Sequence, residues 1–303
     1  MYNYFTQEQK DSIKDMLVAY IERFGSMNKA ANNLDRVSAA TLSSIVNGRY
    51  QNISDDMWRN IRAQVATGTE NDPRTAVVET SVTRDLAFCM AENRANKDFI
   101  WAISPAGSGK TIASKMARKI RNTYYVLCDE DMKKSDFAIE LARAVGLRVN
   151  TQKKARTLIL DVVKYLREQN DVLIIFDEGD KLSDNVLHYF ITIFNHFEDL
   201  SGLQTVGVQF ISTDYMATRM ERGLRYKKKG YQELWSRLGA RFYEVDRNTP
   251  NDVDAICRAR GLVARRDIDE VIKEADRTNY DLRRVSRKIN AIMRRNQLQN
   301  QES

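Results

Sequence analysis

The sequence has few cysteines, only two histidines and no long apolar run. Its cysteines, Cys89, Cys128 and Cys257, are widely spaced, so they indicate neither a disulfide framework nor a zinc site, and reduced thiols are expected. His188 and His196 have no third ligand nearby and are read as ordinary surface or partly buried residues. No apolar stretch approaches the roughly 18 residues that span a bilayer, and the amino terminus lacks a signal-peptide pattern. These absences predict a cytoplasmic protein without a membrane partner.

The composition sets limits on size and partners. The 303 residues suggest about two domains, and 43% hydrophobic residues allow a sizeable core. A net charge of +7 favours a polyanionic partner, although a mixture of both signs also describes a solvated surface. Residues 1–70 hold as many acidic as basic side chains, so the whole excess of positive charge lies after them.

The most informative stretch is residues 104–111, Ser-Pro-Ala-Gly-Ser-Gly-Lys-Thr, between an apolar segment at 99–103 and an amphipathic one. A loop of this kind between a strand and a helix turns backbone N–H groups toward a polyphosphate. Lys110 can reach the β and γ oxygens, and the Thr111 hydroxyl can ligate Mg²⁺. Ser104 stands where the usual pattern has its first glycine. The residues expected to hold the nucleotide are Pro105, Ala106, Gly107, Ser108, Gly109, Lys110 and Thr111.

A pair of acids follows a second apolar segment. Residues 172–176 predict a buried parallel strand that ends in Asp177 and Glu178. The first carboxylate suits the hydration shell of a metal ion, and the second can polarise an attacking water. A glycine-rich turn without a ligand is the alternative for the loop alone, and the acid pair argues against it. The two motifs predict ATP and Mg²⁺ as cofactors, with Thr111 and Asp177 at the metal, and an ATPase activity.

Residues 1–70 show a helix-turn-helix pattern, in which Thr6, Ser26, Ser38 and Ser54 can each cap a helix. In such a module, residues near the start of the second helix of the motif can reach base edges. Here these are Ser38, Ala39, Ala40, Thr41 and Ser43. A packing or docking module without base readout is the alternative, because this region carries no net charge.

The remaining chain is predicted to form an α/β domain and a helical lid. A polar, breaker-rich segment at 67–73 predicts a linker, with a boundary after residue 70. Across residues 71–248, strands alternate with helices, which predicts a five-stranded parallel sheet covered on both faces. Residues 249–303 show only helical patterns. The predicted strands are 99–103, 124–128, 172–176, 206–212 and 241–245, and the lid helices are about 250–260, 267–278 and 281–297.

The order of these motifs resembles that of AAA+ P-loop ATPases. The amino-terminal helix-turn-helix and the stretches 78–80, 177–182 and 234–238 look like those of the AAA+ transposition ATPases, a group that includes the phage Mu B protein, TnsC and IstB. This resemblance implies a homo-oligomer, as a helical filament or ring, that binds duplex DNA with ATP and recruits or activates a transposase. A helicase loader and an ATP-gated helix-turn-helix transcription regulator are the alternatives.

The resemblance also implies roles for single residues. Glu178 would be the catalytic base, and Thr213 would position water at a fourth-strand end where the family often has Asn. Arg283 matches the second sensor, with Arg284 as a competitor. Arg237 lies where relatives present an arginine to the neighbouring subunit's ATP, which implies a site shared between subunits.

Clusters of basic residues are the candidates for DNA contact in the α/β domain, because such clusters neutralise phosphates. A solvated loop is the alternative for each of them. The candidates are Lys133, Lys134, Lys153, Lys154, Arg156, Arg225, Lys227 and Lys228.

Overall fold

The computed structural model describes residues 5–34, 36–65, 77–198, 200 and 202–301. The chain divides into two compact units, one up to Ala76 and one from Val77. The predicted linker at 67–73 and the boundary after residue 70 lie outside the described residues. Among the described helices, none is both long and apolar enough to cross a membrane.

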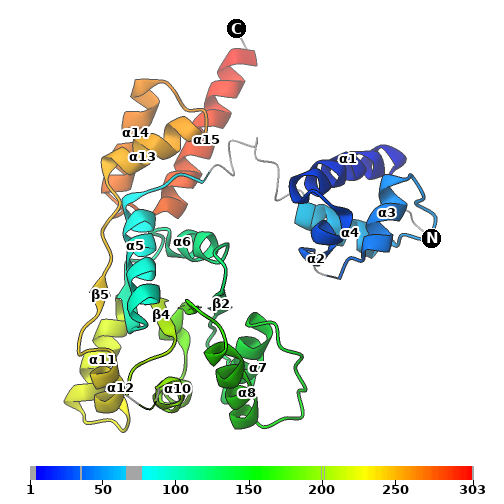
Figure 1. The fold of residues 1–303 in the computed structure, drawn as a ribbon. Helices are drawn as coiled ribbons and strands as arrows, with labels where there is room; N and C mark the ends of the chain where they lie inside the picture. The colour runs from blue at the N-terminus through cyan, green and yellow to red at the C-terminus, as the bar shows by residue number, and fades with distance from the viewer. Residues whose placement is uncertain (1–4, 35, 66–76, 199, 201, 302–303) are drawn as a thin grey trace. The chain divides into compact units, whose positions relative to one another are not determined.

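The described part of the first unit is a bundle of four helices with its own core (Figure 1). Helix α1 begins with the predicted capping box of Thr6, and the side chains of Ser26 and Ser38 accept hydrogen bonds at the starts of α2 and α3. Fully buried side chains from α1, α3 and α4 meet in the core, among them Leu17, Leu42 and Trp58. The four helices are α1 (Gln7–Phe24), α2 (Met27–Asn32), α3 (Ala39–Val46) and α4 (Asp55–Val65).

The second unit is built on a five-stranded sheet, as predicted. All its pairings are parallel, and the strand order is β2-β3-β4-β1-β5. The edge strand β5 is shorter than predicted, because only Tyr243 and Glu244 pair with β1. The strands are β1 (Phe99–Ile103), β2 (Thr123–Leu127), β3 (Leu173–Asp177), β4 (Gly207–Ser212) and β5 (Tyr243–Glu244).

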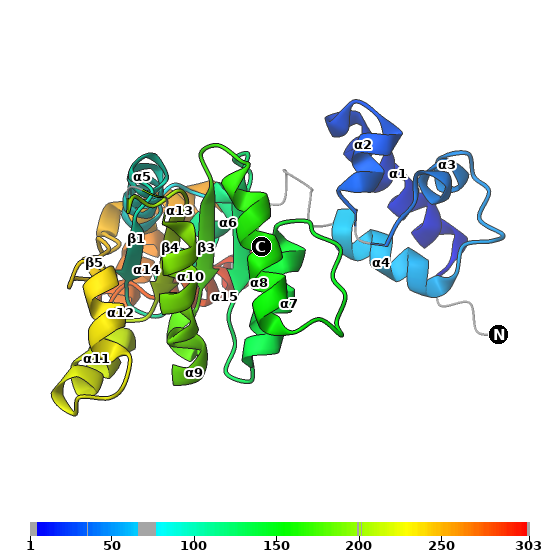
Figure 2. The same ribbon diagram turned by 60° about the horizontal axis from the view of Figure 1, so that its bottom comes forward.

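Helices cover both faces of this sheet (Figure 2). On one face lie α5 (Ser81–Asn96) and α6 (Lys110–Ala117), and on the other lie α7 (Lys134–Ala144), α8 (Ala155–Arg167), α10 (Tyr189–Phe197) and α12 (Tyr231–Arg237). Successive strand residues enter different cores: Phe176 and Phe210 pack with the second group, and Ile175 and Ile211 with the first. Burial on both faces explains why β3 is apolar at every position before its terminal acid.

Two helices were not predicted from the sequence, α11 (Tyr215–Arg225) and α12. The basic stretch at 219–229 is helical in its first half, because Met216 and Met220 lie one turn apart and are buried against the core. The acid pair leads into the short elements η3 (Gly179–Lys181) and α9 (Asp184–Leu187).

The predicted carboxy-terminal helices lie in the same compact unit as the sheet but have their own core. Thr249 forms a capping box with Asp252 at the start of the first of them. Val253, Ile268, Val271 and Ile289 are fully buried between the three helices. These helices, α13 (Pro250–Ala259), α14 (Arg265–Asp276) and α15 (Leu282–Gln301), lie together beyond one end of the sheet (Figure 1).

Candidate nucleotide-binding site

The loop between β1 and α6 has the backbone that a phosphate-binding loop requires. Gly107 (φ +77°) and Gly109 (φ +107°) adopt left-handed conformations that glycine tolerates without a steric penalty. Ser104 replaces the usual first glycine and fits: its hydroxyl donates to the Ser108 hydroxyl at 2.9 Å, and its N–H donates to the Ser212 carbonyl at 3.2 Å. The loop is thus tied to the end of β4.

Lys110 lies inside this loop. Its Nζ donates to the carbonyls of Ser104, at 2.7 Å, and Pro105, at 2.6 Å. Burial lowers the pKa of the Lys110 ammonium group, and the nearby carboxylates of Asp177 and Asp180 oppose that shift. The cation is therefore held where the loop would surround a phosphate group.

Asp177 ends β3 directly opposite the start of α6. It is buried, and its carboxylate accepts hydrogen bonds from the Tyr125 hydroxyl, at 3.1 Å, and from the Glu178 N–H, at 3.0 Å. Burial raises the pKa of Asp177, and hydrogen bonds from Thr111, Tyr125 and Glu178 oppose the rise. The hydroxyl and the carboxylate expected at the metal are thus neighbours.

This pair of ligands suits Mg²⁺, which usually binds through one or two protein groups together with substrate phosphates and water. The described residues contain no cluster of three or more His, Cys, Asp or Glu side chains that could hold another metal. Thr111 and Asp177 are the groups that would hold Mg²⁺, which would neutralise charge on the phosphates when bound.

Glu178 occupies a left-handed backbone conformation, φ 58° and ψ 36°, at the start of η3. This conformation is uncommon for a non-glycine residue and is often found at functional sites. The carboxylate forms an ion pair with Lys181 three residues later. Lys181 was not predicted as a site residue, although its spacing of three residues from Glu178 is visible in the sequence.

Thr213 follows β4 and faces the same turn. Its hydroxyl donates a hydrogen bond to a carboxylate oxygen of Asp180. The neighbouring Ser212 hydroxyl accepts from the Trp101 indole N–H at 2.8 Å. The predicted water-positioning residue is therefore oriented by Asp180, a partner that the sequence did not single out.

The lid and the segment before it contact the phosphate loop through backbone and side-chain groups. The Leu282 N–H donates to the Gly107 carbonyl at 2.9 Å, and a Cβ on Gly107 would lie 2.1 Å from a carboxylate oxygen of Asp281. The buried amide of Asn248 donates to the Ser108 carbonyl at 2.9 Å. Nothing in the sequence singles out Asn248, whose position between β5 and α13 becomes informative only in the folded chain.

The structure separates the two sensor candidates. Arg283 lies near enough to Lys110 that its charge contributes to lowering the pKa of that lysine. Arg284 instead lies 3.9 Å from the Glu274 carboxylate of the lid. The geometry favours Arg283 for contact with a phosphate.

Arg237 lies far from the phosphate loop of its own chain. Its guanidinium donates to the Asn195 side chain at 2.9 Å and lies 5.3 Å from the Phe194 ring centroid. The same side chain lines a cavity of about 740 Å³ together with Asp98, which precedes β1. The loop follows the other end of β1, and five residues of strand span roughly 16 Å.

The basic residues at the starts of α7 and α8 converge. The Lys134 Nζ lies 5.6 Å from the Tyr189 ring centroid. Burial raises the pKa of Tyr189, and the charge of nearby Arg156 opposes that rise. Lys153 pairs with Asp161 at 2.8 Å. Lys134 and Arg156, which are about twenty residues apart in the chain, thus both lie near the Tyr189 side chain. Lys133 and Lys154 occupy the positions just before α7 and α8.

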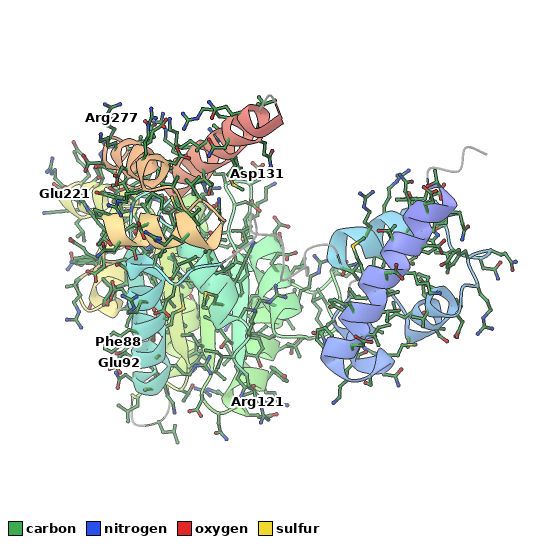
Figure 3. The ribbon with its side chains drawn as sticks, turned by 90° about the horizontal axis from the view of Figure 1, so that it is seen from above. Phe88, Glu92, Arg121, Asp131, Glu221 and Arg277 are labelled. Carbon is green, nitrogen blue, oxygen red and sulfur yellow. The ribbon has the colours of Figure 1, made fainter. Side chains whose placement is uncertain are left out.

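The second group of candidates is partly paired. Arg225 forms an ion pair with Glu221, which lies on α11 (Figure 3). The Lys228 Nζ lies 4.0 Å from Asp184, and Lys227 is exposed. Arg219, from the same basic stretch, points inward and donates to the Asp180 carbonyl.

A parallel sheet of this strand order, with a phosphate loop after β1, an acid pair after β3 and a helical lid, is the AAA+ P-loop NTPase fold. In agreement, a family model described as an AAA domain matches residues 93–211. No curated protein matches the chain.

Solved structures similar to this chain include proteins of Aeropyrum pernix, Pyrobaculum aerophilum and Brucella abortus. The Orc1 protein of Aeropyrum pernix in complex with DNA has a TM-score of 0.51 at 17% identity, with 73% of this chain and 60% of that one covered. The Orc2 protein of the same organism, in ADPNP–ADP complexes, has a TM-score of 0.48 at 12% identity, covering 74% and 72%. Cdc6p of Pyrobaculum aerophilum has a TM-score of 0.41 at 13% identity, covering 59% and 48%. The chain thus spans about half to 60% of Cdc6p and Orc1, and the likeness concerns the fold.

Proposed function

We propose that this protein is an ATP-hydrolysing, DNA-binding AAA+ protein that oligomerises on target duplex DNA and recruits or activates a transposase. The proposed ATPase activity is supported by one observation: the phosphate loop, which includes Thr111, lies next to Asp177 and Glu178 at the carboxyl ends of the parallel strands. Lys110 and Arg283 would bind phosphate oxygens, and Glu178 would accept a proton from the attacking water.

The separation between Arg237 and its own phosphate loop supports a shared site. A cation is needed for the charge that develops on the transferring phosphoryl group, and an arginine supplied by a neighbour can contribute about 10³- to 10⁵-fold. Arg237 would serve the ATP of the next subunit after leaving Asn195. ATP turnover would then rise with protein concentration and with DNA.

DNA binding is supported by the basic residues around Tyr189, and the similar Orc1 structure contains DNA.

The transposition role rests on the sequence stretches at 78–80, 177–182 and 234–238. Purified transposase should bind the ATP- and DNA-bound protein, whereas selective binding of a replicative helicase would favour a helicase loader instead.

The test mixes two inactive variants. Arg237→Ala should keep ATP binding but lose DNA-stimulated hydrolysis, and Glu178→Gln should bind ATP without turning it over. In a mixed oligomer, the Arg237→Ala subunit retains its base and receives an arginine from its neighbour, so ATPase activity should recover. If mixed oligomers form and no mixing ratio exceeds either variant alone, Arg237 does not act between subunits.

A further inference from the structure

Arg219 is the one member of the basic stretch at 219–229 whose side chain is largely buried, with 16% of it exposed. Its Nη1 donates to the carbonyls of Asp180, at 2.9 Å, and Leu182, at 2.7 Å. Both carbonyls belong to the turn that follows Glu178. The guanidinium therefore holds the backbone of the segment that presents the proposed catalytic base.

The other edge of the same guanidinium faces a different element. Its Nη2 donates to the Asp184 carboxylate, and its Nε donates to the Tyr231 hydroxyl at 3.2 Å. That hydroxyl in turn donates to Asp184 at 2.8 Å. Burial alone would raise the pKa of Asp184, but the hydrogen bonds from Arg219 and Tyr231 hold it below its ordinary value.

Tyr231 is the first residue of α12, the helix that ends at Arg237. It is almost fully buried, and a Cβ on Gly223 would lie 2.0 Å from its ring, so α11 and α12 meet closely here. One rigid side chain thus connects the turn after Glu178 with the first turn of α12. Only arginine offers five donors in a planar fork that can serve these partners together.

We propose that Arg219 is a positioning residue that fixes the catalytic turn at residues 178–182 and helix α12 relative to one another. It would set Glu178 toward the ATP of its own subunit and Arg237 toward the ATP of the next. The proposal rests on the proposed function, because it requires hydrolysis at Glu178 and an arginine acting between subunits. Arg219 touches no reacting atom itself.

The first test replaces Arg219 by lysine, which keeps the charge but cannot hold all partners. DNA-stimulated ATP turnover should fall by about 10- to 10²-fold, a loss typical of small misplacements of catalytic groups. ATP affinity should change little, and the melting temperature should fall to a limited extent, because Asp184 and Tyr231 lose hydrogen bonds. Arg222→Lys, on the same helix but exposed, is the matched control and should behave as wild type. Full turnover in Arg219→Lys, or a loss of turnover matched by equally weakened ATP binding, would overturn the proposal.

The second test asks whether the defect reaches the neighbouring subunit. Wild-type protein is mixed with Glu178→Gln or with Glu178→Gln/Arg219→Lys; neither variant hydrolyses ATP, but both donate Arg237 to wild-type sites. The double variant should depress wild-type turnover more than the single one does, and equal turnover in the two mixtures would overturn the link to α12. If Arg219→Lys does not fold, Tyr231→Phe takes its place in both tests, because it removes one hydroxyl and keeps the ring. Tyr231→Phe should also lower ATP turnover.

The complementation of Arg237→Ala by Glu178→Gln serves as the reference for both tests. If those two variants fail to complement, the shared site itself is wrong. If they complement while Arg219→Lys leaves both mixtures unchanged, the shared site stands and the role of Arg219 is wrong.

Discussion

At the scale of single residues, Glu178 forms an ion pair with Lys181. This pair would have to break before Glu178 could act as the proposed catalytic base. Its carboxylate pairs with Lys181, and this hydrogen-bonded pairing raises the pKa of the lysine. A raised pKa keeps the ammonium group charged well above neutral pH, so the pair is not released by changes in the physiological range. A water molecule must compete with Lys181 for the carboxylate.

Lys181→Met should therefore raise ATP turnover without DNA, by about 2- to 10-fold, because the base is then free to meet its water. Both partners are substantially exposed, so the melting temperature should scarcely change. Lys181→Arg, which keeps the positive charge, is the control and should retain the wild-type rate. A steady-state ATPase assay without DNA measures this change. A fall in turnover for Lys181→Met would contradict the prediction and would mean that the lysine supports catalysis.

Residue identity alone separates some candidates and not others. The strand–loop–helix pattern around residues 104–111 and the strand that ends in Asp177 were predictable, because the spacing of the first pattern is specific and the second is an apolar run that ends in an acid. Arg283 and Arg284 are adjacent arginines, and only the packing of α15 places one near Lys110 and the other near Glu274. Arg219 is different, because it lies three residues after buried Met216 on the same face of α11, so the helical spacing could have distinguished it from its exposed neighbours.

At the scale of elements, the phosphate loop and the start of α15 fit so closely that only glycine is tolerated at position 107. A Cβ there would overlap the Asp281 carboxylate at 2.1 Å, in addition to adopting a positive φ. The left-handed conformation itself costs a non-glycine residue roughly 1–2 kcal/mol. The close contact means that any widening of the loop would also displace the lid.

Gly107→Ala should consequently weaken ATP binding by more than its backbone strain predicts, as isothermal titration would measure. Gly146→Ala is the matched control: this glycine also has a positive φ, but a Cβ there would meet nothing within 4 Å. It should lower the stability of the fold and leave ATP affinity unchanged. Shortening Asp281 to glycine in the Gly107→Ala protein should restore part of the affinity. Equal ATP affinities for Gly107→Ala and Gly146→Ala would contradict a tight loop–lid contact.

The elements that were predicted are those with strong local patterns. Strands β1 and β3 are apolar runs followed by polar residues, and helices α1 and α13 begin with side-chain caps. The predicted strand β5 was too long, because Arg241 and Phe242 continue the alternation of polar and apolar residues. In the structure, Phe242 packs against Trp101 and Trp235 and does not pair with β1. Helix α11 was missed because its dense positive charge masked the spacing of its buried methionines.

At the scale of the whole molecule, the two units have separate cores and different charge. The first unit carries no net charge through residue 70, and the basic cluster around Tyr189 belongs to the second. Because counterion release from phosphates supplies most non-specific affinity for DNA, the second unit should contain the main duplex-binding surface. The helical bundle of the first unit, predicted to be a helix-turn-helix module, would then add sequence preference or a protein contact.

A chain that starts at Val77 should accordingly bind duplex DNA in the presence of ATP, with weak sequence dependence and a steep loss of affinity as salt increases. Replacing both Lys134 and Arg156 by alanine should weaken binding to all sequences alike. It should also reduce the slope of log K against log salt by about 2, since each phosphate contact contributes about 1. Lys164→Ala, near the opposite end of α8, is the control and should leave the slope unchanged. Fluorescence anisotropy with the two separated units would decide the matter: DNA binding by residues 1–76 alone, with none by the chain from Val77 at low salt, would place the DNA surface on the helical bundle.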